Sequence, residues 1–128
     1  TKYEKGVSRV EAPEYTNIYG DSFVVGDKDI TGIGNNVVVE YADMDFGAEG
    51  VDAIAIWGRT PLAGNTAHIN FTGEDGVSVR RILEIRGTKD YEKQEISFEK
   101  LTGKGKVEFI FLPGTDFDME AFQFLRKN

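Results

Sequence analysis

Apolar and polar residues alternate along most of the chain, in short runs that are rich in Val, Ile, Phe and Tyr. This period of two places the apolar side chains on one face of an extended strand. Clusters of glycine and other turn-forming residues separate the runs too closely for crossover helices. The pattern therefore predicts antiparallel β-structure along the chain. The alternating apolar residues form the predicted core: Ile54, Ile56, Ile69, Phe71, Ile96, Phe98, Val107, Phe109 and Phe111.

The spacing of these runs predicts an all-β fold, an antiparallel two-sheet β-sandwich (jelly roll) with about nine strands. A single open sheet of this size would expose its edges and one whole face. The apolar residues shift phase between Tyr41 and Met44, which predicts a β-bulge there. The predicted strands are residues 7–12, 21–25, 37–46, 52–57, 67–72, 77–85, 94–98, 106–112 and 117–125, and the predicted turns are residues 26–27, 35–36, 64–65, 73–76, 102–105 and 113–114.

Length and charge limit the domain count and the partners. The chain has 128 residues, near the commonest domain size, so we expect residues 1–128 to form one domain. The 22 acidic residues outnumber the 15 basic ones, and the formal net charge of -7 repels nucleic acid and anionic membranes. No apolar run approaches the roughly 18 residues of a membrane span. We expect neither nucleic acid nor a membrane as partner.

Other features bear on the parent protein and on catalysis. The chain starts at Thr1 without an initiator Met, so we expect it to be a piece of a longer protein. It has no cysteine, which excludes disulfides and a cysteine nucleophile but leaves the compartment open. The one histidine, His68, lies within a predicted strand and has no second histidine for a metal or a catalytic pair. We expect no enzyme activity.

Three segments resemble family 6 carbohydrate-binding modules in order and approximate spacing. Residues 10–15 (Val-Glu-Ala-Pro-Glu-Tyr) are similar to the family's opening, residues 39–47 (Val-Glu-Tyr-Ala-Asp-Met-Asp-Phe-Gly) to its bulged strand, and residues 117–124 (Phe-Asp-Met-Glu-Ala-Phe-Gln-Phe) to its last strand. The resemblance implies a jelly roll without catalytic activity. Such a module binds an oligo- or polysaccharide and keeps its parent enzyme on that glycan through a high effective concentration.

Residues 57–71 resemble modules that follow family 2 glycoside hydrolases of the β-galactosidase kind. This likeness implies a bacterial glycoside hydrolase as the parent, whose catalytic domain would be a second partner. As part of such an enzyme the module would be extracellular or cell-associated, and a cytoplasmic location stays open.

The resemblance also assigns a sugar-binding cleft. Sugars stack an apolar ring face on an aromatic side chain, and planar polar groups hold their hydroxyls. Tyr91 falls at the family's tryptophan and Asp118 at its asparagine, whereas Gly32 falls at the first aromatic, so one wall of the usual clamp is missing. Trp57 and Glu14 are further candidate contacts. For Tyr91 and Trp57, packing against the sandwich is the alternative role.

The resemblance implies one structural Ca²⁺ between the first and last strands. Glu11 and Glu120 fall at two of its ligands, but Pro13 falls at a third and offers no side-chain oxygen. Because Ca²⁺ takes six to eight oxygen ligands, we expect a weakened or absent site, unless Glu14 or a carbonyl replaces the missing ligand. Two acids on a solvated rim are the alternative.

Two functions from different classes remain open at this point. In the first, the chain is a glycan-binding module for a β-linked or galactose-containing sugar, which the presence of Tyr91 and Asp118 favours. In the second, it is a structural or docking domain that packs against its parent enzyme, which the missing aromatic at Gly32 favours. An exposed aromatic in a cleft would support binding, and a large flat apolar patch would support docking.

Overall fold

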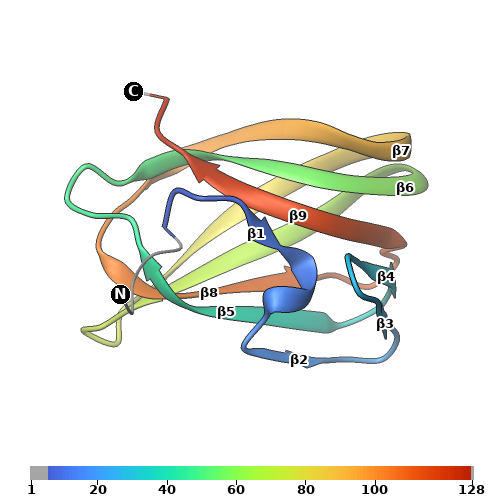
Figure 1. The fold of residues 1–128 in the computed structure, drawn as a ribbon, viewed down its shortest axis with the longest axis horizontal. Coiled ribbons are helices and arrows are strands. Elements are labelled where there is room, and N and C mark those ends of the chain that lie inside the picture. The colour runs from blue at the N-terminus through green and yellow to red at the C-terminus, as the bar shows by residue number, and fades with distance from the viewer. Residues whose placement is uncertain (1–5, 128) are drawn as a thin grey trace.

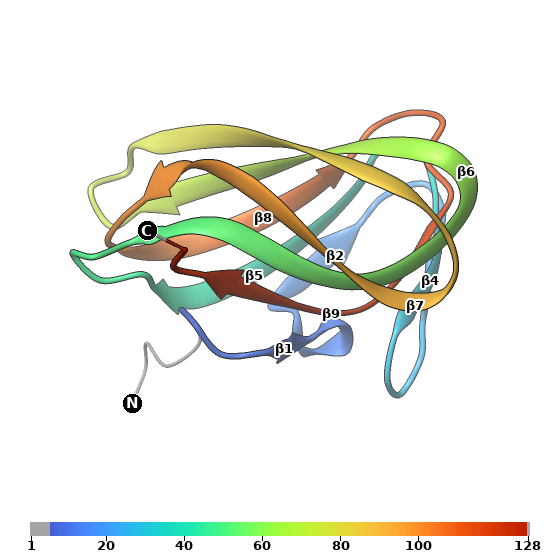
Figure 2. The ribbon, with the colours of Figure 1, turned by 90° about the horizontal axis from the view of Figure 1, so that it is seen from above.

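The computed structural model describes residues 6–127, which are almost entirely β-structure (Figure 1). The strands form one antiparallel sheet that curls into two packed layers, as Figure 2 shows from above. This confirms the predicted all-β sandwich of about nine strands. The elements are β1 (Val10–Glu11), a 3₁₀-helix (Ala12–Glu14), β2 (Asn17–Tyr19), β3 (Val24–Val25), β4 (Ile30–Ile33), β5 (Val37–Asp45), β6 (Val51–Gly73), β7 (Ser78–Leu101), β8 (Lys104–Phe111) and β9 (Phe117–Leu125).

Two long strands, β6 and β7, connect the layers. The strand order is β2-β5-β8-β6-β9-β4-β3, with β1 beside β9 and β7 beside β6. The first part of β6 (residues 53–59) pairs with β9, and its last part (residues 67–73) pairs with β8. Because β7 follows β6 along nearly its whole length, the hairpin bends from one layer into the other (Figure 2).

The long hairpin corrects part of the sequence prediction. Strands 52–57 and 67–72 were predicted with a turn at residues 64–65, but they are one strand, β6, which bends without reversing. The pairing register with β7 shifts between Thr60 and Gly64, where the chain bulges out and then resumes pairing. Strands 77–85 and 94–98 likewise belong to the single strand β7. Glycine and asparagine mark a bend as readily as a turn, so the sequence pattern did not separate the two.

The start of the chain also differs from the prediction. The predicted strand at residues 7–12 is reduced to β1, because Pro13 removes a backbone donor and the chain enters the 3₁₀-helix. The Glu14 carboxylate accepts a hydrogen bond from the Glu11 backbone N–H at 2.9 Å. Of the predicted strand at residues 21–25, only β3 is present, while β2 and β4 were missed because they are short and polar or contain glycine.

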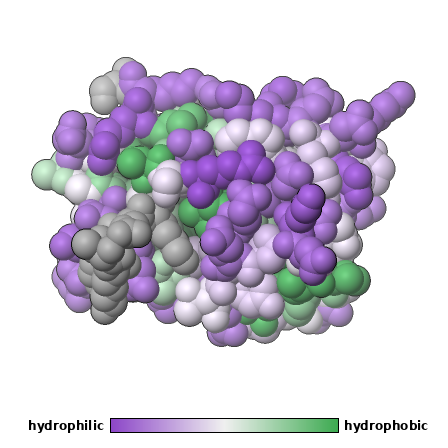
Figure 3. Space-filling model, viewed as in Figure 1, coloured by the Kyte–Doolittle hydropathy of each residue, from purple (hydrophilic) through white to green (hydrophobic). Residues whose placement is uncertain are grey.

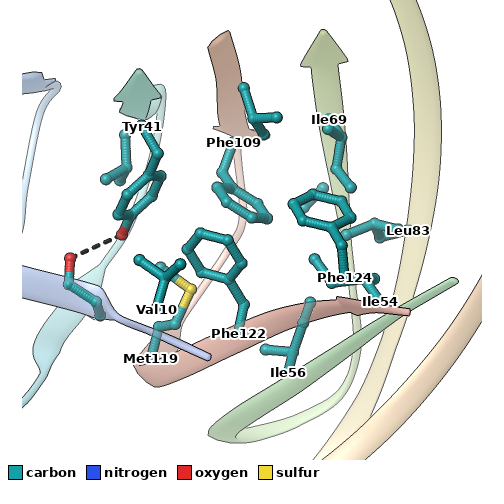
Figure 4. Packing of buried hydrophobic residues seen from close by; sticks show 14 of the residues in the cluster. Val10, Tyr41, Ile54, Ile56, Ile69, Leu83, Phe109, Met119, Phe122 and Phe124 are labelled. Atoms are coloured by element: carbon teal, nitrogen blue, oxygen red, sulfur yellow. Dashed lines mark hydrogen bonds between the residues drawn. The ribbon is translucent and has the colours of Figure 1, made fainter. Parts of the chain in front are cut away.

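The core fills the space between the layers with aromatic rings (Figure 4). The Tyr41 ring packs in it, with ring centroids 5.7 Å from Phe109 and 4.7 Å from Phe122. Its hydroxyl donates a hydrogen bond of 2.7 Å to the carbonyl of Ala12, which fixes the 3₁₀-helix to the core. Burial raises the pKa of Tyr41 well above its usual range. The predicted core residues are buried, apart from Ile96 and Phe98, which are half-buried and pack against the cluster.

The predicted β-bulge in β5 is confirmed. The pairing of β5 with β8 shifts register between Tyr41 and Met44, and Asp43 adopts a positive φ of 60°. The bulge returns Met44 and Phe46 to the core face, where both are fully buried.

Two side chains close the open edge of the sandwich. Within residues 6–127, β7 pairs only with β6, so both halves of β7 are edge strands, one in each layer. The side-chain amide of Gln94 donates to the Arg86 carbonyl at 2.8 Å and accepts from the Arg86 N–H at 3.0 Å. Arg81 donates to the carbonyls of Glu99 at 2.7 Å and Lys100 at 3.2 Å. These contacts join the two halves of β7 and satisfy edge groups.

No helix among residues 6–127 has the length and apolar character needed to cross a bilayer.

Candidate functional site

The bends of β6 and β7 form one end of the sandwich, next to β4 and the start of β9 (Figure 1). A pocket of about 660 Å³ opens there. Residues 59–63 of β6 and 87–89 of β7 form its walls, and Glu92 and Asp118 complete them. Its volume lies within the range of small-molecule sites.

A polar network beneath the pocket fixes the bend. Thr60 and Asn65 are both buried, and the Asn65 amide donates to the Thr60 hydroxyl at 2.9 Å. The Thr60 hydroxyl donates to the backbone carbonyl of Asp116. The backbone N–H of Asp116 in turn donates to the Asn65 side-chain oxygen at 3.1 Å. Asn65 was predicted to form a turn, but its side chain ties the bend of β6 to the start of β9. Satisfied buried networks of this kind make a local structure rigid.

Arg59, which lines this pocket, contacts both Tyr91 and Asp118. The Arg59 Nε donates to Asp118 Oδ2 at 2.7 Å, and the Arg59 Cζ lies 4.5 Å from the centroid of the Tyr91 ring. The hydrogen bond to Asp118 raises the pKa of the Arg59 guanidinium, which stays charged. The structure thus brings together two residues that the resemblance assigned to one cleft, although they come from β7 and β9.

Tyr91 and Asp118 each form a further hydrogen bond that does not involve Arg59. The Tyr91 hydroxyl donates to Asp29 Oδ2 at 2.6 Å, and burial, together with this hydrogen bond, raises the pKa of Tyr91. Asp118 Oδ1 accepts the backbone N–H of Gly32 at 2.9 Å. Gly32 has a positive φ of 61°, and a Cβ placed there would contact nothing within 4 Å. The space above Gly32 is therefore open, at the position to which the resemblance assigns the family's first aromatic.

Trp57 and Glu14 belong to other contact groups. Trp57 lies under the guanidinium of Arg9, whose Cζ is 4.4 Å from the indole centroid. Glu14 stabilises the 3₁₀-helix.

Sequence reasoning missed Arg59 and Asp29, which hold Tyr91 and Asp118 in place. Arg59 does lie in the segment 57–71, but an arginine after a strand carries no signal of its own.

The acids expected to bind calcium are already paired with an arginine. Arg9 Nε donates to Glu11 Oε2 at 2.7 Å, and its Nη2 lies 3.5 Å from Glu120 Oε1. The hydrogen bond to Glu11 raises the pKa of Arg9. Among residues 6–127, no group of three or more His, Cys, Asp or Glu residues could hold a metal ion. The residues present do not fit a calcium ion, because a cationic side chain lies between the two carboxylates.

No protein-family profile matches the sequence, and no curated protein matches it. Solved structures do match, along nearly the whole chain. A family 6 carbohydrate-binding module whose binding sub-sites were dissected by crystallography and titration calorimetry is 21% identical, covers 96% of both chains and has a TM-score of 0.78. A module from Clostridium stercorarium, solved with cellobiose, is 16% identical, covers 97% of this chain and 98% of its own, and has a TM-score of 0.79.

Two further structures extend this group. An arabinoxylan arabinofuranohydrolase of glycoside hydrolase family 43 from Bacillus subtilis, solved with cellotetraose, is 24% identical with a TM-score of 0.76. The match covers 96% of this chain but 28% of that enzyme. A family 36 module solved with calcium and xylotriose is 19% identical, covers 92% of this chain and 99% of its own, and has a TM-score of 0.61. The chain therefore has the β-sandwich fold of family 6 carbohydrate-binding modules.

Proposed function

We propose that this chain is a non-catalytic module that binds a neutral β-linked saccharide at the end of the sandwich. One observation carries the proposal: an aromatic side chain, Tyr91, and a carboxylate, Asp118, meet beside a pocket of about 660 Å³. A sugar needs an aromatic face for its apolar side and a planar polar group for its hydroxyls. Trp57 and Glu14 are not part of this proposed site.

The charge of the pocket favours a neutral ligand. Its walls contain two basic residues, Arg59 and Lys89, and two acidic residues, Glu92 and Asp118. Asp29 adds another negative charge beside Tyr91, and the whole chain has a formal net charge of -7. A uronic acid or a sulfated sugar would meet no excess of positive charge there. The similar modules solved with cellobiose and xylotriose support a neutral β-linked ligand of the gluco- or xylo- type.

We further propose that the module belongs to a bacterial glycoside hydrolase and keeps that enzyme on its glycan. The arabinofuranohydrolase match supports this role, because the matched part is a small fraction of a much longer enzyme. Binding through the module raises the concentration of glycan near the catalytic domain without any chemistry in the module itself. The likeness of residues 57–71 to modules that follow β-galactosidases makes such an enzyme our first candidate for the parent.

The test is a calorimetric titration of the chain with cello-, xylo- and β-1,3-gluco-oligosaccharides and with galactosides. We expect saturable binding to at least one β-linked series, and its loss in Tyr91→Ala. Tyr19→Ala is the matched control, because Tyr19 is an exposed tyrosine on β2 and has no part in the cleft. Unchanged binding by Tyr91→Ala would place the sugar elsewhere. The absence of measurable binding to every oligosaccharide in the panel would overturn the proposal.

Docking, the second candidate, is supported by a row of cross-strand neighbours that are apolar except for His68. The row crosses the outer face of the β2-β5-β8-β6-β7 layer, and its end residues Tyr19 and Ile82 are exposed. The face drawn in Figure 3 is mostly hydrophilic, with apolar residues in small separate patches. If no sugar binds, docking through this row becomes the better-supported function. The cross-strand neighbours in order are Tyr19, Val38, Ile110, His68 and Ile82.

A further inference from the structure

A single guanidinium group contacts both residues proposed to recognise the sugar. Arg59 lies over the Tyr91 ring and donates to the Asp118 carboxylate. Arg59 and Asp118 line the pocket, and Tyr91 lies behind Arg59. We propose that Arg59 controls access to the cleft by occupying the place of the sugar until a ligand displaces it. This inference rests on the proposed function, because it concerns the same site.

The platform beneath Arg59 does not depend on Arg59. Tyr91 is held by Asp29 at 2.6 Å, and Asp118 is held by the Gly32 N–H at 2.9 Å. Both groups therefore keep a hydrogen bond when the guanidinium leaves. Once Arg59 has left, a sugar can stack on the Tyr91 ring, and Asp118 Oδ2 can accept a hydrogen bond from a sugar hydroxyl. The recognition groups are fixed, and the group that covers them is the mobile element.

Arg59 itself is weakly held. Its side chain is 42% exposed, and among residues 6–127 it has one hydrogen-bonding partner, Asp118. Exposed ion pairs contribute little to stability, and an exposed cation–π contact adds a modest amount. Gly32, whose N–H donates to Asp118, has no side chain, and the space where its Cβ would lie is open. Displacing Arg59 is therefore feasible, and the apparent affinity equals the affinity of the open cleft multiplied by the fraction of time that the cleft is open.

The experiment compares the sugar affinity of the native chain with that of Arg59→Ala. We expect Arg59→Ala to bind severalfold, up to about tenfold, more tightly, since a cleft that is open about one tenth of the time loses that factor. Arg80→Ala is the control, because Arg80 is an exposed arginine on β7 with the same charge. Its affinity should equal that of the native chain.

The native chain offers a second readout that needs no variant. A neutral ligand makes no ion pairs, so its affinity should not depend directly on salt. If Arg59 competes through its ion pair with Asp118, rising salt weakens the competitor and tightens sugar binding. Tightening in the native chain but not in Arg59→Ala supports the inference. Equal or weaker binding by Arg59→Ala, with the native chain binding normally, overturns this inference alone, whereas silence of both proteins overturns the proposed function with it.

A separate observation concerns the start of the chain. Arg9 lies between Glu11 and Glu120, which come from β1 and β9, and stacks on Trp57 from β6. We infer that the Arg9 guanidinium takes the place of a metal ion here and ties the first strand to the last one. Its planar fork suits carboxylates, and the indole face favours a cation above it. With Pro13 at the third position, a divalent cation would have too few oxygens and would be repelled by Arg9.

Thermal unfolding tests this second inference. The native chain should unfold at the same temperature in excess calcium and in EDTA, and a saturable rise with calcium would overturn the inference. Arg9→Met should lower the unfolding temperature in both solutions, and by less in a Glu120→Gln background, because the two groups interact. An unchanged temperature for Arg9→Met would also overturn it. Arg80→Met controls for the loss of an arginine on the surface.

Discussion

Replacing Gln94 with methionine should destabilise the sandwich through the loss of two hydrogen bonds. Gln94 is 3% exposed, and its amide makes hydrogen bonds of 2.8 and 3.0 Å to the backbone of Arg86. Methionine has nearly the same volume, so packing changes little. Each net hydrogen bond contributes about 0.5–1.5 kcal/mol, which gives a loss of about 1–3 kcal/mol in the free energy of unfolding. The two halves of β7 would then be joined mainly by Arg81.

Urea denaturation measures this loss, and amide hydrogen exchange locates it. The backbone N–H of Arg86 should exchange much faster in Gln94→Met, because its acceptor is gone. Gln123→Met is the matched control, since Gln123 makes one exposed hydrogen bond of 3.1 Å to Val7 and should cost less than about 0.5 kcal/mol. The reasoning is refuted if Gln94→Met costs no more than Gln123→Met, or if the protection of Arg86 is unchanged.

Three further predictions follow from single contacts. Tyr41→Phe removes the hydrogen bond to Ala12 and should lower the free energy of unfolding in urea by about 1–3 kcal/mol. Because burial raises the pKa of Tyr41, the stability of the native chain should hold below about pH 10 and fall as pH rises further. A Tyr41→Phe chain whose free energy of unfolding falls with the same slope above about pH 10 would contradict this. Gly32→Tyr should restore an aromatic wall and tighten sugar binding in calorimetry, at about 1–2 kcal/mol of stability for its positive φ; weaker binding would argue against the cleft. Asp29→Ala should weaken sugar binding severalfold by freeing the Tyr91 hydroxyl, while the unfolding temperature changes little; unchanged affinity would show that Asp29 does not position the ring.

The sequence predicted the sheet content and the core, because burial on one face imposes a period of two that local composition records. The bulge between Tyr41 and Met44 was visible for the same reason. It did not predict that residues 52–57 and 67–72 belong to one strand, since the bend depends on the buried contact between Asn65 and Thr60. A hydrogen bond between two buried side chains leaves no periodic signal in the pattern of apolar and polar residues along the sequence.

The candidate site shows the same division. Tyr91 and Asp118 were found through a resemblance of residue types at similar places, and the fold brings them together. Arg59 and Asp29 were not identified because their roles depend on geometry: Arg59 lies over the Tyr91 ring, and Asp29 accepts a hydrogen bond from the Tyr91 hydroxyl. Neither relation can be inferred from a residue type or a spacing. Long-range side-chain contacts of this kind require the folded chain.

The bend of the β6–β7 hairpin links the stability of the fold to the proposed function. β7 places Tyr91 at the pocket and Gln94 three residues later at the closed edge, so both side chains depend on one curved segment. A straight hairpin would leave the two layers apart and would move Tyr91 away from β9 and Asp118. The contacts that hold the sandwich edge therefore also set the distance between the aromatic ring and the carboxylate. Loosening that edge should weaken the binding of a ligand that needs both groups at once, even though Gln94 and Arg81 lie outside the proposed site.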